Sequence, residues 1–304
     1  MGNDPEKIIE LVNVSKIYRM GTEKIYAVDN VSFDIKKGEF CCLLGTSGSG
    51  KSTLLNLMAG IEKATSGKII IKGKNIPKMN ENSLARFRQR NLGFVFQAYN
   101  LIHSMTALEN VEFPLVFKRV PAKKRRKLAK EILIKVGLGS RLTHKPKEMS
   151  GGQQQRVGIA RAFVAMPEIV FADEPTGNLD TKTTIEVMEL IKQMAHDNNQ
   201  TIVMVTHDRS LAAYADKIIH ILDGKIQSVE ETAREAGEDM QVYLKAISRK
   251  ILADRGGDAG TEPGSVSAIE EKRSTITVQV PKKAVVRPAN IKRITPIYKK
   301  GNEK

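Results

Sequence analysis

Residues 40–52 read FCCLLGTSGSGKS, and this stretch decides the fold. The first five residues are continuously apolar, as in a short strand that is buried on both faces of a sheet. The next eight match the pattern GxxxxGK[ST], and a helix-like segment follows to about Ala59. Glycines at these positions let backbone N–H groups turn around phosphate oxygens at the start of a helix. The stretch therefore predicts a strand–loop–helix unit that binds a nucleoside triphosphate.

The side chains of this phosphate loop suit a triphosphate that is bound with Mg²⁺. Lys51 can reach the β- and γ-phosphates, and the hydroxyl of Ser52 can ligate the metal ion. The predicted nucleotide contacts in this region are Gly45, Thr46, Ser47, Gly48, Ser49, Gly50, Lys51, Ser52 and Thr53.

Two carboxylates follow a second apolar run. Residues 169–174 read IVFADE, so Asp173 and Glu174 stand at the end of a predicted buried strand. Such pairs also occur as helix caps or as solvated strand ends. In a chain with a phosphate loop, Asp173 suits the Mg²⁺ shell and Glu174 suits a general base for the attacking water. We therefore predict Asp173 as a metal ligand and Glu174 as a catalytic residue.

A second phosphate-binding helix start lies at residues 150–156, which read SGGQQQR. The two glycines leave backbone N–H groups free beside a serine hydroxyl. One nucleotide needs only one such cradle within a chain. We therefore predict that Ser150, Gly151, Gly152 and Gln153 contact a nucleotide that is held by another subunit.

These motifs together resemble the ATP-binding cassette (ABC) transporter family. The run SGGQ with QRVGIARA at residues 155–162 is similar to the family's signature, and Gln97, Asp173–Glu174, residues 178–180 (NLD) and His207 follow in its order. The resemblance covers roughly residues 7–227. Within this family, the chain resembles ATPases of the LolD, MacB and FtsE type. The segments that carry this resemblance are ADEPTGNLD (172–180), LARFR (84–88), GFVFQ (93–97) and TALENV (106–111). Met149, where leucine is commoner, is a nearly volume-conserving departure.

Strand-like and helix-like segments alternate along the chain, which favours an α/β fold. Residues 7–35 alternate apolar and polar side chains, as in antiparallel strands with one solvated face, whereas the stretch from about Thr106 to Arg161 is helical in character. With the resemblance, we expect a P-loop NTPase core with a mainly parallel central sheet, an antiparallel β subdomain, a helical signature subdomain at about residues 98–161 and a C-terminal extension. The nucleotide-binding domain would span residues 1–227.

The resemblance also implies roles for single residues. Tyr18 lies where the family stacks an aromatic ring on adenine, and His207 lies where the family contacts the γ-phosphate. Gln97 matches the glutamine that senses Mg²⁺ and the attacking water and links them to the membrane partner. Asp180 matches the residue that couples the two nucleotide sites of a dimer.

An assembly is implied in the same way. Two cassettes would form a homodimer, close head to tail around two ATP molecules and drive a separate transmembrane permease from the cytoplasmic face of the cell membrane. Relatives of the LolD and MacB type export or extract lipophilic or peptide substrates. FtsE-like members instead transmit force to a cell-envelope partner without transport, and both activities stay open at this level.

The net charge of +15 indicates contact with something anionic. Trp is absent and aromatic residues make up 5%, so stacking platforms for single-stranded nucleic acid are scarce, and we expect no nucleic-acid partner. Residues 118–127 carry much of the charge. They are interpreted either as a solvated helix face or as a segment that contacts anionic lipid or an acidic protein surface.

The remaining composition excludes several classes. The two cysteines, Cys41 and Cys42, are adjacent, so a disulfide scaffold and a zinc site are both excluded, and we expect both side chains in the core. The apolar runs fall far below the roughly 18 residues of a membrane span. Met1–Glu10 is polar and acidic, unlike a signal peptide.

Residues 228–304 extend beyond the usual end of the resembled ATPases. Ser228 and Glu231 have the spacing of a capping box, which predicts an amphipathic helix over residues 228–253. Its apolar stripe, Met240, Leu244, Ile247 and Ile251, should pack on the chain's own domain or contact a partner. Residues 254–304 are expected to be a flexible linker and basic tail, with one strand at residues 276–280.

Overall fold

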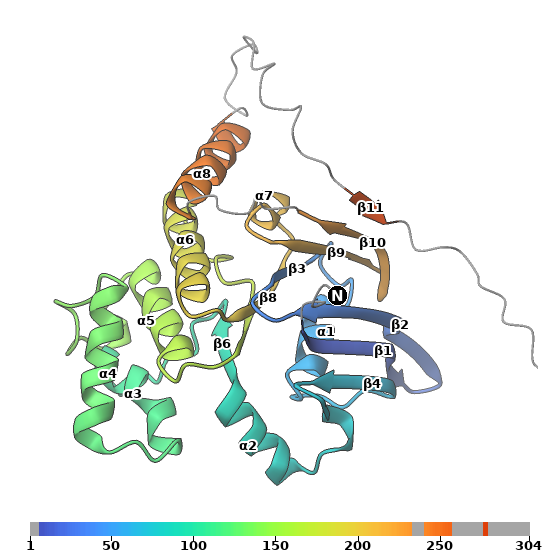
Figure 1. The fold of residues 1–304 in the computed structure, drawn as a ribbon, viewed down its shortest axis with the longest axis horizontal. Coiled ribbons are helices and arrows are strands. Elements are labelled where there is room, and N and C mark those ends of the chain that lie inside the picture. Colours follow the sequence, from blue (N-terminus) through green and yellow to red (C-terminus); the bar gives the residue numbers. More distant parts are fainter. Residues whose placement is uncertain (1–5, 233–239, 257–275, 279–304) are drawn as a thin grey trace, which may run out of the picture.

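The computed structural model describes residues 6–232, 240–256 and 276–278 (Figure 1). Its central sheet has seven strands in the order β11-β10-β9-β3-β8-β7-β6. The five strands from β9 to β6 pair in parallel, and β10 and β11 extend the edge antiparallel. The bounds are β3 (Phe40–Leu44), β6 (Leu92–Phe96), β7 (Ile169–Asp173), β8 (Thr201–Thr206), β9 (Lys217–Leu222), β10 (Lys225–Glu231) and β11 (Ile276–Val278).

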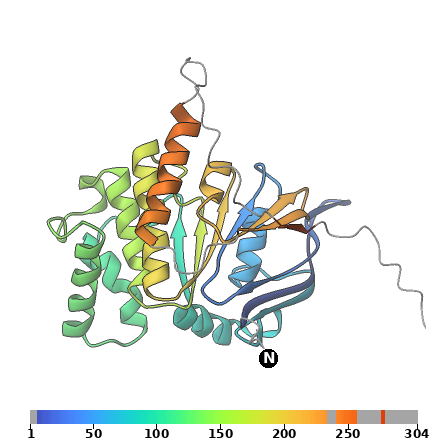
Figure 2. The same cartoon turned by 45° about the horizontal axis from the view of Figure 1, so that its top comes forward.

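A second, antiparallel sheet has the order β2-β1-β4-β5. It consists of β1 (Lys7–Met20), β2 (Glu23–Lys36), β4 (Ser66–Ile71) and β5 (Lys74–Asn75). Helix α1 (Lys51–Met58) contacts β2 and β4 of this sheet and β7 and β8 of the central sheet. Figure 2 shows the resulting layers, with the antiparallel sheet and α1 on one side of the central strands and longer helices on the other.

The apolar run of residues 40–44 explains why the core lies on both faces of the central sheet. Cys41 and Leu43 face the cluster shared with α1 and the antiparallel sheet, and Phe40, Cys42 and Leu44 face the cluster under the helices. Every residue of β3 is buried. Both cysteines are free thiols with no exposed surface, so the expectation that they serve core packing is confirmed.

Helices follow where the sequence predicted them between residues 106 and 161. They are α3 (Ala107–Phe117), α4 (Ala122–Lys135) and α5 (Gly151–Phe163), with a short 3₁₀ turn, η2 (Pro146–Glu148), before α5. Helix α3 starts with a capping box between Thr106 and Glu109. Ahead of this region lie η1 (Ile76–Lys78) and α2 (Glu81–Asn91).

The last part of the chain contains α6 (Thr181–Asp197), α7 (Arg209–Ala212) and α8 (Met240–Gly256). The prediction that a helix starts at Ser228 is wrong. Ser228 lies inside β10, opposite His220 of β9, and Ile226 and Val229 pack against the core. Pairing with a neighbouring strand overrides the local capping pattern, because the capping signal is worth less than a ladder of backbone hydrogen bonds with burial.

Helix α8 packs on its own domain, alongside α6 (Figure 1 and Figure 2). Leu244, Ile247 and Ile251 are buried in the core cluster, which confirms the expected packing of that stripe. The Tyr243 hydroxyl donates to the carbonyl of Ala213, at 3.3 Å. Of the predicted tail, the structure describes the end of α8 and β11, which pairs with β10; the linker prediction otherwise lies outside the described residues.

Leu244→Ala should lower the free energy of unfolding by about 2–5 kcal/mol, because Leu244 is 3% exposed and the truncation leaves a cavity under α8. Leu252→Ala is the matched control on the same helix, since Leu252 is 53% exposed and its loss should stay within about 0.5 kcal/mol. Urea denaturation measures both. Equal effects of the two variants would show that α8 does not dock as described.

Candidate active site

The phosphate loop passes between two backbone segments, which is why it needs glycine. Gly50 has φ +96°, and a Cβ there would lie 2.0 Å from the carbonyl oxygen of Ala27 in β2. A Cβ on Gly45 would lie 2.1 Å from the carbonyl oxygen of Ile221 in β9. No side chain fits either gap. The two sheets therefore hold the loop from both sides, with its backbone at the amino end of α1.

Lys51 points into the loop rather than into solvent. Its side-chain nitrogen donates to the carbonyl of Thr46 at 2.6 Å and to the Ser49 hydroxyl at 3.5 Å, and the residue is 5% exposed. Burial lowers the pKa of Lys51, opposed by the negative charges of Glu174 and Asp173. A partly desolvated ammonium held against loop oxygens is suited to contact a bound triphosphate.

Ser52 and Asp173 meet from different elements. The Ser52 hydroxyl donates to the Asp173 carboxylate at 3.1 Å, from the first turn of α1 to the end of β7. Burial raises the pKa of Asp173, and the hydrogen bond from Ser52 opposes this shift. Mg²⁺ binds hard oxygen ligands, usually one or two carboxylates with water and phosphate oxygens. This hydroxyl–carboxylate pair beside a phosphate loop fits that chemistry.

Glu174 and His207 contact each other at the edge of the same site. Glu174 Oε1 lies 3.0 Å from His207 Nδ1. Glu174 has φ +43°, outside the usual range for a non-glycine residue, and its backbone N–H donates to the carbonyl of Val205 at 3.0 Å. This contact with β8 holds the turn, which aims the carboxylate across the end of β8. The His207 side chain is 60% exposed, so the pair stands at the open side.

A hollow of about 460 Å³ lies beside this pair and the loop, lined by Leu44, Gly45, Thr46, Ser47, Glu174, His207, Arg209 and His220. Sequence reasoning missed Arg209 and His220. Arg209 comes two residues after His207, and His220 sits on β9, where its Nε2 lies 2.8 Å from Glu230 Oε1. The position of Arg209, two residues after His207, could have identified it from the sequence. No local pattern in the sequence marked His220.

Tyr18 lies next to the start of α1. Its hydroxyl donates to Glu62 at 2.5 Å and also hydrogen-bonds with the Thr53 side chain. Burial raises the pKa of Tyr18, and the contact with Glu62 adds to the shift. The Lys16 ammonium lies 5.0 Å from the centroid of the Tyr18 ring, and Tyr18 is 38% exposed. An exposed aromatic ring is thus anchored at the edge of the phosphate loop.

Gln97 follows β6 and packs against the segment that comes after Glu174. A Cβ on Gly177 would lie 2.6 Å from the Gln97 amide nitrogen, so the amide occupies the space beside that glycine. Asn178 donates to the backbone carbonyl of Gln97 at 3.1 Å. The structure therefore couples Gln97 to residues 177–178.

Residues 150–153, which we call the signature loop, form the start of α5. The Ser150 hydroxyl accepts from the Gln153 N–H at 3.3 Å, and the Gln153 side chain accepts from the Ser150 N–H at 3.1 Å. Asp180 caps α6, because its carboxylate accepts hydrogen bonds from the N–H and the hydroxyl of Thr183. These hydrogen bonds lower the pKa of Asp180. Both loops line one hollow of about 340 Å³, with Gly151, Gly152, Arg156, Asn178, Leu179 and Glu186.

Apart from Tyr18 and Gln97, the predicted site residues fall into two groups. The phosphate loop, Lys51, the Ser52–Asp173 pair and the Glu174–His207 pair gather at the carboxyl edge of the parallel strands. Ser150–Gln153 and Asp180 line the second hollow, which shares no lining residue with the hollow beside the phosphate loop. Within one chain, the two phosphate-binding helix starts therefore line different hollows.

The chain is similar to known ATP-binding proteins. The family model described as ABC transporter matches residues 28–177. An uncharacterized ABC transporter ATP-binding protein of Thermotoga maritima is 48% identical over 225 residues, covering 74% of this chain and 96% of that protein. The macrolide export ATP-binding/permease protein MacB of Hyphomonas neptunium is 43% identical over 79% of this chain, which spans only 37% of that longer protein.

Solved structures give the same match. The ATP-binding cassette MJ0796 of Methanocaldococcus jannaschii, in a dimeric post-hydrolysis state bound to ADP and Pi, is similar with a TM-score of 0.69 and 44% identity. The match covers 73% of this chain and 98% of that one. The expected α/β cassette, with its parallel core and antiparallel sheet, is confirmed.

Proposed function

Because the chain belongs to the ABC transporter family and is an ATPase of it, we propose that it is the ATP-hydrolysing subunit of a membrane complex, working as a homodimer with a separate permease. The observation that carries this proposal is the gathering of Lys51, Ser52–Asp173 and Glu174–His207 beside one phosphate loop. In the complex the chain would sit at the cytoplasmic face of the membrane.

On this proposal the loop and its neighbours bind and orient ATP. Backbone N–H groups of Gly45–Gly50 and the Lys51 ammonium contact the phosphates, while Tyr18 stacks on the adenine next to Thr53. Ser52 and Asp173 would hold Mg²⁺, with Gln97 as a further ligand, and the ion would neutralise charge on the phosphate oxygens. The hydroxyl–carboxylate contact in the structure supports the first two assignments.

Glu174 acts as the general base in this scheme. Its carboxylate accepts a proton from the water that attacks the γ-phosphate, and His207 holds the carboxylate through the 3.0 Å contact at Nδ1. That contact is a hydrogen bond when Nδ1 carries a proton, and Nε2 can donate to a γ-phosphate oxygen only when it carries a proton as well, because phosphate oxygens are acceptors. His207 therefore positions the base and contacts the phosphate with its second ring nitrogen.

The separation of the two hollows supports a dimer. Ser150–Gln153 and Asp180 line a hollow that shares no residue with the hollow beside the phosphate loop, which fits a signature loop that contacts the nucleotide of another chain. In a head-to-tail pair, each signature loop would contact the ATP of the other chain. The dimeric form of the related cassette MJ0796 supports the same arrangement here.

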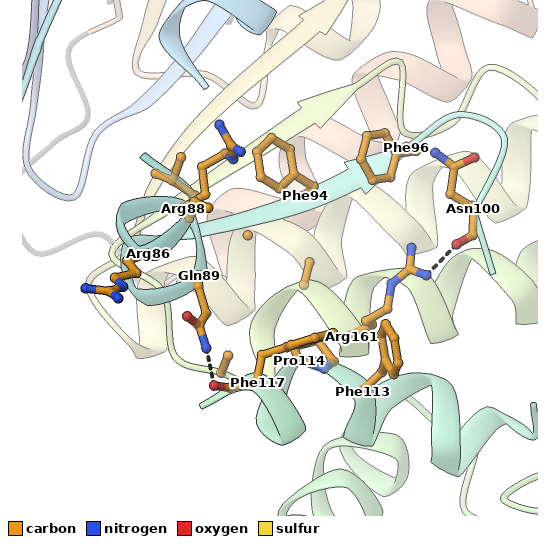
Figure 3. Close-up of a pocket in the computed structure, with 15 residues that line it drawn as sticks. Arg86, Arg88, Gln89, Phe94, Phe96, Asn100, Phe113, Pro114, Phe117 and Arg161 are labelled. Carbon is orange, nitrogen blue, oxygen red and sulfur yellow. Dashed lines mark hydrogen bonds between the residues drawn. The ribbon is translucent and has the colours of Figure 1, made fainter. Parts of the chain in front are cut away.

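A pocket of about 540 Å³ between α2, β6 and α3 is the proposed permease contact (Figure 3). Its wall carries aromatic and apolar side chains, namely Phe94, Phe96, Phe113, Pro114 and Phe117. Arg86 and Arg88 of α2 stand along one side, and Arg161 reaches in from α5 to donate to the carbonyls of Asn100 and Tyr99. A permease helix with apolar anchors and carboxylates would fit it, and β6 leads directly from it to Gln97.

The test is the ATPase rate of the chain reconstituted in proteoliposomes with the membrane protein that co-purifies with it. We expect the permease to change the rate and Phe117→Ser to weaken that response, because Phe117 is 57% exposed and lines the pocket. The basal rate without permease should stay unchanged. Ile134→Ser is the matched control, since Ile134 is 53% exposed and lies outside the pocket.

A response that survives Phe117→Ser in full would contradict the proposed docking pocket. Partner-dependent ATPase activity without movement of any lipophilic or peptide substrate across the vesicle membrane would favour the FtsE-like alternative over transport.

A further inference from the structure

The junction between α3 and α4 carries exposed apolar and basic side chains side by side. Val116 and Phe117, at the end of α3, are 45% and 57% exposed. Arg119 follows in the connecting turn, and the first turns of α4 expose four more cations. We call this set the α3–α4 corner: Val116, Phe117, Arg119, Lys123, Lys124, Arg126 and Lys127.

The cations of this corner are largely unpaired. Lys127 has Glu131 at 3.9 Å on its own helix, and Arg125 is held by Glu112 and is therefore left out of the set. Among the residues that the structure describes, Lys123, Lys124 and Arg126 form no ion pair within 4.0 Å, and the Arg126 charge contributes to the lowered pKa of Glu109. Their charge is thus available to an anionic partner.

The corner adjoins the proposed permease pocket. Phe117 belongs to both, the Gln89 side chain of α2 donates to its carbonyl, and Lys118 donates to the carbonyl of Arg90 at 3.3 Å. Figure 3 shows Gln89 next to Phe117 at one end of the pocket. A permease seated there would bring the bilayer towards this side of the chain; this orientation rests on the proposed function.

We propose that the α3–α4 corner binds the headgroups of anionic lipids at the membrane surface. Basic side chains near an anionic bilayer each strengthen binding by about fivefold, and apolar side chains among them can enter the interface. A bilayer offers both chemistries together, phosphate groups for the cations and acyl chains for Val116 and Phe117. That pairing favours a lipid surface over an acidic protein.

The experiment measures partition of the whole chain, without any permease, into vesicles of phosphatidylcholine alone and of phosphatidylcholine with phosphatidylglycerol. We expect binding only to the anionic vesicles, and loss of most of it at 0.5 M salt, where charges are screened within about 4 Å. Lys123→Gln/Lys124→Gln/Arg126→Gln should weaken partition on the order of 100-fold, and Val116→Ser should weaken it by a further, smaller factor.

The matched control is Lys245→Gln/Arg249→Gln/Lys250→Gln. It removes two exposed lysines and one exposed arginine from α8, which packs on α6 and α7. Its partition should stay within about threefold of the parent, and both triple variants should keep the basal ATPase rate, because none of these side chains lines either nucleotide hollow.

Equal losses in both triple variants would overturn the proposal, because net charge alone would then account for binding. The proposal would also be overturned if the parent chain did not bind anionic vesicles, or if the α4 triple variant bound them normally. An α4 triple variant that fails only to join a permease in detergent would show an acidic protein surface as the partner. The permease response of Phe117→Ser is measured separately. The vesicle result can therefore be interpreted even if that variant shows that the pocket does not bind the permease.

Discussion

Glu174→Gln should lower ATP turnover by about 10²–10⁴-fold and leave ATP binding intact. The carboxylate stands at the open edge of the phosphate hollow, 3.0 Å from His207 Nδ1, where an attacking water would meet it. Glutamine keeps the shape and an oxygen for His207 but cannot take a proton at neutral pH. The lost rate corresponds to about 2.7–5.5 kcal/mol of barrier.

Steady-state ATPase assays and equilibrium nucleotide binding measure the two halves of this expectation. Binding should persist because Lys51 and the loop backbone are untouched, so a closed, ATP-loaded dimer should accumulate and be seen by size-exclusion chromatography. Glu81→Gln serves as a control, since this exposed carboxylate pairs with Lys63 at the surface. Turnover within about threefold of the parent would show that Glu174 is not the base.

Gly151→Asp is the second large effect, and it should abolish hydrolysis while one chain still binds ATP almost normally. A Cβ on Gly151 would meet the Tyr99 hydroxyl at 2.8 Å, the far end of a side chain that can move, so the fold should tolerate the change. The carboxylate then faces the second hollow, where it would repel the triphosphate of the other chain. Closure of the dimer should fail.

Lys51→Ala damages the other half of each site. It removes a buried ammonium from the phosphate loop, and charge-assisted contacts of this kind contribute about 1.5–3 kcal/mol to binding. Mixed dimers of Gly151→Asp and Lys51→Ala chains contain one site that is built only from intact halves. If one intact composite site is enough for hydrolysis, ATPase activity should reappear on mixing.

The control for this mixture is a chain that carries both changes, mixed with the Lys51→Ala chain, because no intact site can then form. Absence of recovery in the first mixture would show that both sites must act together. Weak ATP binding by the Gly151→Asp chain alone would contradict the trans arrangement, since the signature loop would then contact nucleotide within its own chain.

Local sequence was sufficient to predict features that depend on the backbone of one short segment. The glycines of residues 45–50 are needed because the loop has positive φ at Gly48 and Gly50, and because a Cβ on Gly45 would lie 2.1 Å from the carbonyl oxygen of Ile221. The run of residues 40–44 is apolar at every position because both faces of β3 are buried. Ser150 and Asp180 are caps of α5 and α6, and capping depends only on residues three apart.

Local patterns failed where distant strands decide. The spacing of Ser228 and Glu231 fits a helix start, yet pairing with β9 makes both residues part of β10. The stripe of α8 could be assigned as apolar from spacing, but its partner, the face of α6 and α7, is set by the tertiary fold.

The sequence by itself determined the phosphate loop, the signature helix start and the two carboxylates at the end of β7, because each is a short motif whose chemistry lies in neighbouring residues. Only the tertiary structure decided which of them meet. Parallel strands end at the same edge of a sheet, so Ser52 reaches Asp173 across 121 positions of sequence, and Glu174 reaches His207 across 33. The same packing adds Arg209 and His220 to the phosphate hollow and places the signature loop at a different hollow, since contacts between distant segments depend on how the sheets and helices stack.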